Sequence, residues 1–231
     1  MNILLAERAL RLITARRRAL RRKRSDSLRE IEYWKSVCRG FVSPRVPVIN
    51  YLPDHRESPH RKLEVPSAWV GIESILRALM KRFDIRGGRC LEFGVEHGYS
   101  TVALSNFFET VVGVDTFKGD AHTRDFRDLF TDTSQRLAAY PNIHLVRRDY
   151  RDWIAKDTTS YDLIHVDIVH TYVDTFNCGL WSAHHAHCVL FHDTETFPSV
   201  KQAVIDIART TGKHFHNFKE SCGLGILVSE R

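Results

Sequence analysis

A glycine-containing turn between two apolar runs is the sequence feature that most limits how this chain can fold. Residues 89–101 read Arg-Cys-Leu-Glu-Phe-Gly-Val-Glu-His-Gly-Tyr-Ser-Thr, and residues 110–115 read Thr-Val-Val-Gly-Val-Asp. Gly94 and Gly98 allow the backbone to turn sharply and to approach a ligand closely. The helix that follows such a turn aims its unpaired N–H groups at that ligand. The pattern predicts a strand, a tight turn, a helix and a second strand.

A carboxylate completes this pattern. Asp115 ends the second apolar run, 17 residues after Gly98. In nucleotide-binding folds, an acid about 20 residues beyond the glycine turn binds ribose hydroxyls. A glycine turn alone is weak evidence, but the turn together with both strands and the terminal acid predicts a pocket for an adenosine-type cofactor.

The positive charge of the chain is concentrated at its N-terminus. The 231 residues carry a net charge of +6, but residues 1–24 hold nine Lys or Arg against one acid, so the remainder sums to −2. Residues 2–23 lack Pro and Gly and are rich in Leu, Ala and Arg, which predicts a helix. We therefore expect a basic helical arm over residues 1–42. The arm either contacts an anionic surface such as a membrane or nucleic acid, docks on another subunit of a homo-oligomer, or is solvated.

Composition indicates one large domain in a reducing compartment. The chain is 43% hydrophobic, which is enough to fill the core of one domain with an appendage. Its five cysteines form no C-x-x-C pair, so a secreted disulfide framework is not expected. No apolar run approaches the roughly 18 residues needed to span a membrane, and the N-terminus lacks the pattern of a signal peptide. We predict a cytoplasmic location without a transmembrane segment.

Beyond the arm, strand-like and helix-like segments alternate. Residues 43–67 hold five prolines and are expected to form an irregular connection to a main domain over residues 68–231. This connection is either a linker or a segment that lies across a cofactor pocket. The last two strand-like runs leave no room for a helix between them, so they should form an antiparallel hairpin. The predicted fold is α/β: a doubly wound, mostly parallel, seven-stranded Rossmann-like sheet ending in this hairpin. The expected strands are 89–95, 110–115, 142–147, 161–167, 187–192, 214–218 and 223–228. The expected helices are one that carries the apolar residues at 72, 75, 76, 79 and 80, and those over 99–108, 124–139, 170–184 and 198–211.

Acidic side chains recur at the predicted strand ends. Asp115, Asp149, Asp167 and Asp193 each end a strand or follow it closely. Alone, each such acid is more often a helix cap or turn former than a functional group. Their recurrence at one edge of one sheet predicts a bound ligand or cation there, because like charges held together need one.

These residues resemble the class I S-adenosylmethionine-dependent methyltransferases, most closely the branch that acts on sugars and other small hydroxylated metabolites. The likeness runs in order over residues 68–229. The motifs that carry it are Leu91-Glu92-Phe93-Gly94 with Gly98-Tyr99-Ser100, Gly113-Val114-Asp115 with Asp120 and His122, Tyr161 to Tyr172 with Asp167 and His170, Leu190 to Thr194, and Gly223 to Val228.

The resemblance implies roles for individual residues in binding S-adenosylmethionine. The two glycines would form the turn under its methionine part, bordered by Glu92 and Ser100 at the amino-acid end. Asp115 would accept hydrogen bonds from the ribose, and Asp149 would meet the adenine amino group. The full set implied to bind the cofactor is Glu92, Gly94, Gly98, Ser100, Asp115, Thr116 and Asp149.

The resemblance also implies a reactive end of the pocket. Asp167 would lie beside the transferred methyl group, and Asp193 would approach it from the next strand. In metal-dependent relatives, acids at these two strand ends bind Mg²⁺ or a similar hard cation, which suits carboxylate oxygens. In this sequence His192 stands where such relatives have a second acid.

A hydroxyl acceptor must lose its proton during methyl transfer. The sulfonium is already activated, so the protein mainly aligns the acceptor oxygen with the methyl carbon. A metal could lower the pKa of the hydroxyl, or a histidine could act as base. His170, three residues after Asp167, and His192 are the candidate bases; a buried or backbone-bonded structural role is the competing interpretation for each.

The predicted function is S-adenosylmethionine-dependent O-methylation of a hydroxyl on a sugar or small metabolite. An NAD-dependent oxidoreductase fits less well, because three residues separate Gly94 and Gly98 in place of the G-x-G-x-x-G pattern. Two further hypotheses are a nucleic-acid methyltransferase that uses the basic arm and a non-catalytic methyltransferase-like binding protein.

Overall fold

The computed structural model of the protein describes residues 25–119 and 127–229. The chain divides into two compact units, residues 1–43 and residues 44–231. The helix predicted over residues 2–23 lies outside the described residues, as do Asp120 and His122. Within the described part, none of the helices is long and apolar enough to cross a membrane.

The first unit contains a helix over residues 25–42. Five of its large apolar side chains are exposed, and their spacing places them on one side of the helix. They are Leu28, Ile31, Trp34, Phe41 and Val42. The predicted contact of the arm with an anionic surface or another subunit stays a prediction.

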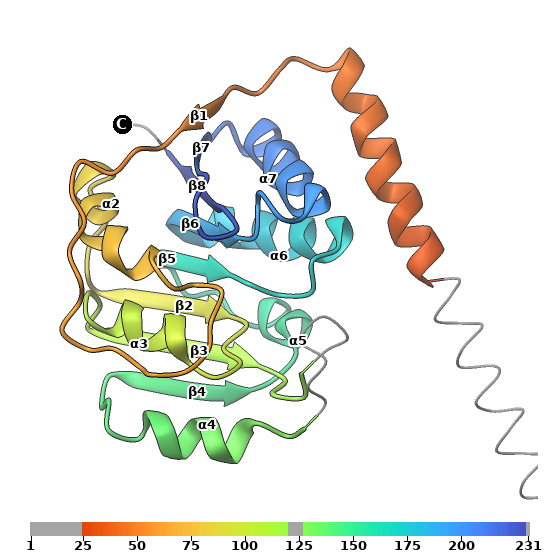
Figure 1. The fold of residues 1–231 in the computed structure, drawn as a ribbon. Helices are drawn as coiled ribbons and strands as arrows, with labels where there is room; N and C mark the ends of the chain where they lie inside the picture. The colour runs from red at the N-terminus through yellow and green to blue at the C-terminus, as the bar shows by residue number, and fades with distance from the viewer. Residues whose placement is uncertain (1–24, 120–126, 230–231) are drawn as a thin grey trace, which may run out of the picture. The chain divides into compact units, whose positions relative to one another are not determined.

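The second unit is built on an eight-stranded sheet with helices on both faces (Figure 1). The strand order is β1-β7-β8-β6-β5-β2-β3-β4, and all neighbours are parallel except those of β8, which runs antiparallel to β6 and β7. The strands are β1 (Val48–Asn50), β2 (Arg89–Phe93), β3 (Thr110–Asp115), β4 (Ile143–Arg147), β5 (Tyr161–Val166), β6 (Ala186–His192), β7 (His214–Phe218) and β8 (Leu224–Val228). This confirms the predicted fold class and the closing hairpin, with one strand more than expected.

The sheet has a hydrophobic core on each face, and alternate residues of a strand contribute to different cores because successive side chains point to opposite faces. Cys90 packs with η1, α2 and α3 on one face, while its neighbour Leu91 packs with α5, α6 and α7 on the other. Burial on both faces explains why the parallel strands read as continuous apolar runs. The helices are η1 (Ile72–Ile75), α2 (Leu76–Arg82), α3 (Tyr99–Ser105), α4 (Phe130–Leu137), α5 (Tyr150–Ile154), α6 (Tyr172–His185) and α7 (Pro198–Thr211).

Two elements were not expected from the sequence. α5 has only five residues, too few to show a helical period, but its first turn is capped by Asp149, whose side chain accepts from the Arg151 N–H. β1 lies in the proline-rich connection and consists of three exposed residues. It forms because its backbone pairs with β7, more than 160 residues later, for example Ile49 with His216. Local sequence carries no signal for such a distant pairing.

Gly94 lets the ends of three strands meet. Its φ is +89°, and a Cβ on this residue would lie 1.7 Å from the carbonyl oxygen of Asp167, which follows β5. Its N–H donates to the Val114 carbonyl at 3.0 Å, and the Asp167 N–H donates to the Phe93 carbonyl at 2.8 Å. The turn after β2 is therefore held against the ends of β3 and β5, and no side chain fits between them.

This close approach predicts that Gly94→Ala destabilises the fold far more than Gly212→Ala. Gly212, at the end of α7, also has a positive φ of +72°, but nothing lies within 4 Å of its added Cβ. Gly212→Ala should cost about 1–2 kcal/mol for the left-handed backbone. Gly94→Ala adds a collision with backbone and should cost at least about 3 kcal/mol. Urea unfolding of both variants measures the difference, and equal losses would show that the end of β5 can move away freely.

Candidate functional site

A cavity of about 570 Å³ opens at the carboxyl ends of the central strands. This is where ligands bind in open α/β sheets. Two residues of the predicted site, Glu92 and Gly98, are not among those that line it. The nine that do are Gly94, Ser100, Asp115, Thr116, Asp149, Asp167, His170, His192 and Asp193.

Gly98 shapes the glycine turn from outside the cavity. It precedes α3 with a φ of +88°, and an added Cβ would lie 2.7 Å from the Leu137 side chain of α4. A side chain at this position would collide with the Leu137 side chain and would be held in a backbone conformation that L residues rarely adopt. Its position indicates that Gly98 is needed for the shape of the turn.

Asp115 ties the end of β3 to the glycine turn. One carboxylate oxygen accepts hydrogen bonds from the Val95 N–H at 2.8 Å and the Glu96 N–H at 2.9 Å, and the other accepts from the Phe117 N–H at 2.7 Å. A carboxylate has about four lone-pair sites, so these three donors leave about one for a ligand hydroxyl. Asp115 thus lines the cavity and also fixes the backbone around it.

Asp149 lines the cavity at the start of α5. Besides capping this helix, its carboxylate pairs with the Arg151 guanidinium at 3.0 Å. The same guanidinium pairs with the buried Asp174, which also accepts from the Tyr150 hydroxyl at 2.8 Å. This network holds the far wall of the cavity to α6.

Glu92 lies behind the cavity wall, which corrects the prediction that it borders the cofactor directly. The residue is fully buried. Its carboxylate accepts from the hydroxyls of Ser100 and Thr101, both at 2.5 Å, and lies 3.0 Å from His165 Nδ1. The prediction failed because side chains of a strand alternate between its faces: Glu92 projects into the core between α3 and β5, and only Ser100 reaches the cavity.

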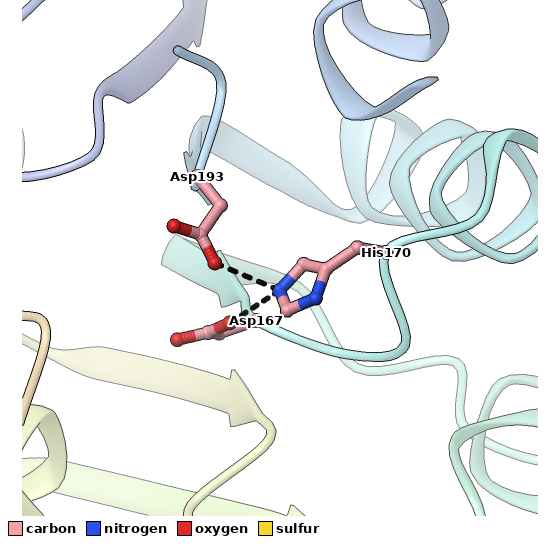
Figure 2. Close-up of side chains that lie close together, drawn as sticks. All are labelled: Asp167, His170 and Asp193. Carbon is pink, nitrogen blue, oxygen red and sulfur yellow. Dashed lines mark ion pairs between the residues drawn. The ribbon is translucent and has the colours of Figure 1, made fainter. Parts of the chain in front are cut away.

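Two acids and two histidines meet at one end of the cavity. Figure 2 shows three of them, Asp167, His170 and Asp193. His170 Nε2 lies 2.9 Å from Asp193 Oδ2 and 3.5 Å from Asp167 Oδ1. His192 Nδ1 lies 3.2 Å from Asp167 Oδ2 and 3.6 Å from Asp193 Oδ2. The His170 ring also stacks on Phe197, with ring centroids 4.2 Å apart. We call these four residues the acid–imidazole cluster; the structure brings them together as the sequence predicted.

The close pairing shifts the pKa values in this cluster. Burial opposes the charged form of Asp167, but hydrogen bonds from His170 and His192 hold the pKa of its carboxyl well below the usual range. Burial likewise opposes protonation of His170, yet its hydrogen bonds to Asp167 and Asp193 raise its pKa to about 9. The pKa of His192 is raised against its burial by the hydrogen bond to Asp167. At neutral pH His170 is therefore a cation between two carboxylates.

The cluster fits Mg²⁺ poorly. Ligand atoms of Asp167, His170 and Asp193 lie within 4.8 Å of one another, close enough to share one ion. Mg²⁺ requires near-octahedral oxygen ligation, but here both carboxylates already face imidazole nitrogens. A mixed set of carboxylates and imidazoles is more suited to Zn²⁺ or another transition metal. The predicted Mg²⁺ site on Asp167 and Asp193 is therefore not supported by the donor chemistry.

The sequence interpretation left open that the proline-rich connection lies across the pocket, but it singled out none of the residues at the end of this connection that line the cavity. Pro66, Ser67, Ala68 and Trp69 line it, and Trp69 is nonetheless only 1% exposed. A tryptophan directly after a proline-rich connection was the available signal, because such a large side chain is seldom left in solvent. The Trp69 indole N–H donates to His165 Nε2 at 3.2 Å. This contact could not be predicted, because the sequence around His165 does not show which residue its side chain will meet.

Comparisons with known proteins agree with this geometry. A family model described as a methyltransferase domain matches residues 91–194. No curated protein sequence matches the chain. Similar solved structures include a putative O-methyltransferase from Klebsiella pneumoniae (TM-score 0.51, 13% identity, 74% of this chain and 84% of that chain) and CalS10, an amino pentose methyltransferase from Micromonospora echinaspora (TM-score 0.54, 10% identity, 71% and 92%). The O-methyltransferase NovP is similar as well (TM-score 0.54, 14% identity, 65% and 75%).

The similar solved structures establish the fold, and the match to the family model includes most of the residues that line the cavity. Residues 91–194 include the glycine turn, Asp115, Asp149 and the whole acid–imidazole cluster. The hypothesis of an NAD-dependent oxidoreductase is thereby set aside. Residues 91–194 therefore match a methyltransferase domain, and the fold of the chain is that of the similar methyltransferase structures.

Proposed function

We propose that this methyltransferase transfers the methyl group of S-adenosylmethionine to a hydroxyl of a small acceptor, a sugar or similar metabolite. The observation that carries the proposal is the acid–imidazole cluster at one end of the cavity whose other walls include the glycine turn. A hydroxyl must give up a proton when it accepts a methyl group, and the cluster supplies groups that can take it. The cavity volume of about 570 Å³ suits a small-molecule site.

The lining residues fit S-adenosylmethionine along the length of the cavity. Gly94 and Ser100 would lie at its methionine part, Asp115 with Thr116 at the ribose, and Asp149 at the adenine amino group. The remaining lone-pair site of Asp115 would accept a ribose hydroxyl. When bound, the cofactor supplies a methyl group already activated on a sulfonium.

The cluster then holds the acceptor and receives its proton. The Asp167 side chain is 27% exposed, more than those of His170, His192 and Asp193, so we assign it the contact with the acceptor hydroxyl. His170, protonated at neutral pH, fixes both carboxylates. His192 Nδ1 lies 3.2 Å from the other oxygen of Asp167 and orients this carboxylate toward the hydroxyl whose proton it takes. Alignment of the hydroxyl with the methyl carbon supplies the rest of the rate enhancement.

Cofactor binding gives the first test. Titration calorimetry with S-adenosylhomocysteine should show binding that Asp115→Asn weakens at least about tenfold, since the amide can no longer accept at every site. Asp162→Asn is the matched control: this acid also accepts a backbone N–H, that of Arg89 at 2.9 Å, but at the opposite ends of the strands. It should change the affinity less than about threefold. A wild-type protein that does not bind S-adenosylhomocysteine would refute the proposal.

The reactive end of the cavity gives the second test. With labelled S-adenosylmethionine and a panel of sugars and hydroxylated metabolites, Asp167→Asn should lower kcat at least about 100-fold, because the neutral amide cannot take the hydroxyl proton. Its affinity for S-adenosylhomocysteine should stay within about threefold of wild type, as the cofactor is held elsewhere. An Asp167→Asn variant with unchanged kcat would remove the carboxylate from the mechanism.

A further inference from the structure

A buried chain of hydrogen bonds joins two residues that line the cavity, Trp69 and Ser100. The Trp69 indole N–H donates to His165 Nε2 at 3.2 Å, and His165 Nδ1 lies 3.0 Å from Glu92 Oε1. The Ser100 hydroxyl donates to the same Glu92 oxygen at 2.5 Å. Trp69 is 1% exposed, while His165 and Glu92 are fully buried. Three side chains from distant parts of the sequence thus connect to one hydroxyl that lines the cavity.

The chemistry of these groups fixes the direction of every bond. An indole nitrogen can only donate, so His165 Nε2 carries no proton and accepts. The His165 proton therefore sits on Nδ1 and is donated to Glu92. The Glu92 carboxylate accepts this hydrogen bond together with those from the hydroxyls of Ser100 and Thr101. The single proton of the Ser100 hydroxyl is committed to Glu92, which leaves the oxygen of Ser100 with only lone pairs to offer the cavity.

We propose that Trp69, His165 and Glu92 are positioning residues that make Ser100 a hydrogen-bond acceptor for the α-ammonium group of the cofactor. The inference rests on the proposed function and deepens it, since it specifies which group of the amino-acid end Ser100 recognises. A Ser100 free to rotate could equally donate to a carboxylate. Locked by the relay, it selects a cationic donor.

Thr101 provides an internal control for this proposal. Its hydroxyl donates to the second oxygen of Glu92, also at 2.5 Å, but Thr101 is fully buried and does not line the cavity. Thr101→Val removes one hydrogen bond from the same carboxylate without altering the surface that the cofactor meets. Any effect that passes only through stability should therefore appear equally in Thr101→Val.

The test compares S-adenosylhomocysteine with its desamino analogue, in which hydrogen replaces the α-amino group. The wild type should bind the parent ligand at least about tenfold more tightly, because a hydrogen bond to a charged group is involved. Glu92→Met, which removes the acceptor of the Ser100 proton, should bring the two affinities within about threefold. Glu92→Gln retains one acceptor oxygen and should lie closer to wild type. Thr101→Val should keep the full preference.

Each outcome of this calorimetric test decides the inference. If Glu92→Met does not fold, Ser100→Ala removes the acceptor alone and should abolish the preference in the same way. A preference for the amino group that survives Ser100→Ala, or that Thr101→Val abolishes as fully as Glu92→Met, would overturn the proposal. A wild type that binds the desamino analogue as tightly as the parent would overturn it without affecting the proposed function. Failure to bind either ligand would refute the proposed function itself.

A spectroscopic measurement tests the relay without any ligand. In ¹⁵N-histidine-labelled protein, His165 should appear as the neutral tautomer with its proton on Nδ1. A protonated Nε2 would show that the Trp69 N–H is not donated to His165, and would break the first link of the relay.

Discussion

The close contact between Gly94 and the Asp167 carbonyl is the constraint on which the rest of the site depends. It brings the turn after β2 against the end of β5, while hydrogen bonds from the Gly94 N–H to Val114 and from the Asp167 N–H to Phe93 align β3 on one side and β5 on the other. The glycine turn, Asp115 and the acid–imidazole cluster therefore share one edge of the sheet. Gly94 and Asp167 both line the cavity, so the loss of this contact would separate the glycine turn from the acid–imidazole cluster.

Charge is arranged differently at the two ends of the cavity. At the end that we propose for the ribose, Asp115 is compensated by three backbone N–H groups, so its position is fixed relative to the glycine turn. At the end that we propose to be reactive, Asp167 and Asp193 are compensated by imidazoles whose pKa values this pairing raises. Fixed amides suit a residue that holds a ligand, whereas titratable partners suit a residue that receives a proton. This contrast supports the roles that we propose for the two ends.

Much of the fold could be predicted from local sequence, because apolar runs and helical spacing are strong over most of residues 89–229. β3 and α7 begin and end at the predicted residues. What the sequence could not show depends on distant partners. β1 exists because of its pairing with β7, and the roles of His165 and Glu92 depend on Trp69, which lies 96 positions before His165. The acids and histidines at the strand ends could be predicted to meet, but not which imidazole nitrogen would face which carboxylate.

The most direct test of the account is a crystal structure of the protein with S-adenosylhomocysteine. We expect the ligand in the cavity with its amino group on the Ser100 oxygen, its ribose at Asp115 and its sulfur facing Asp167. Glu92 should stay buried behind Ser100 with no contact to the ligand. A ligand bound in the reverse direction, outside the cavity, or with Glu92 turned out to meet its amino group would contradict the account.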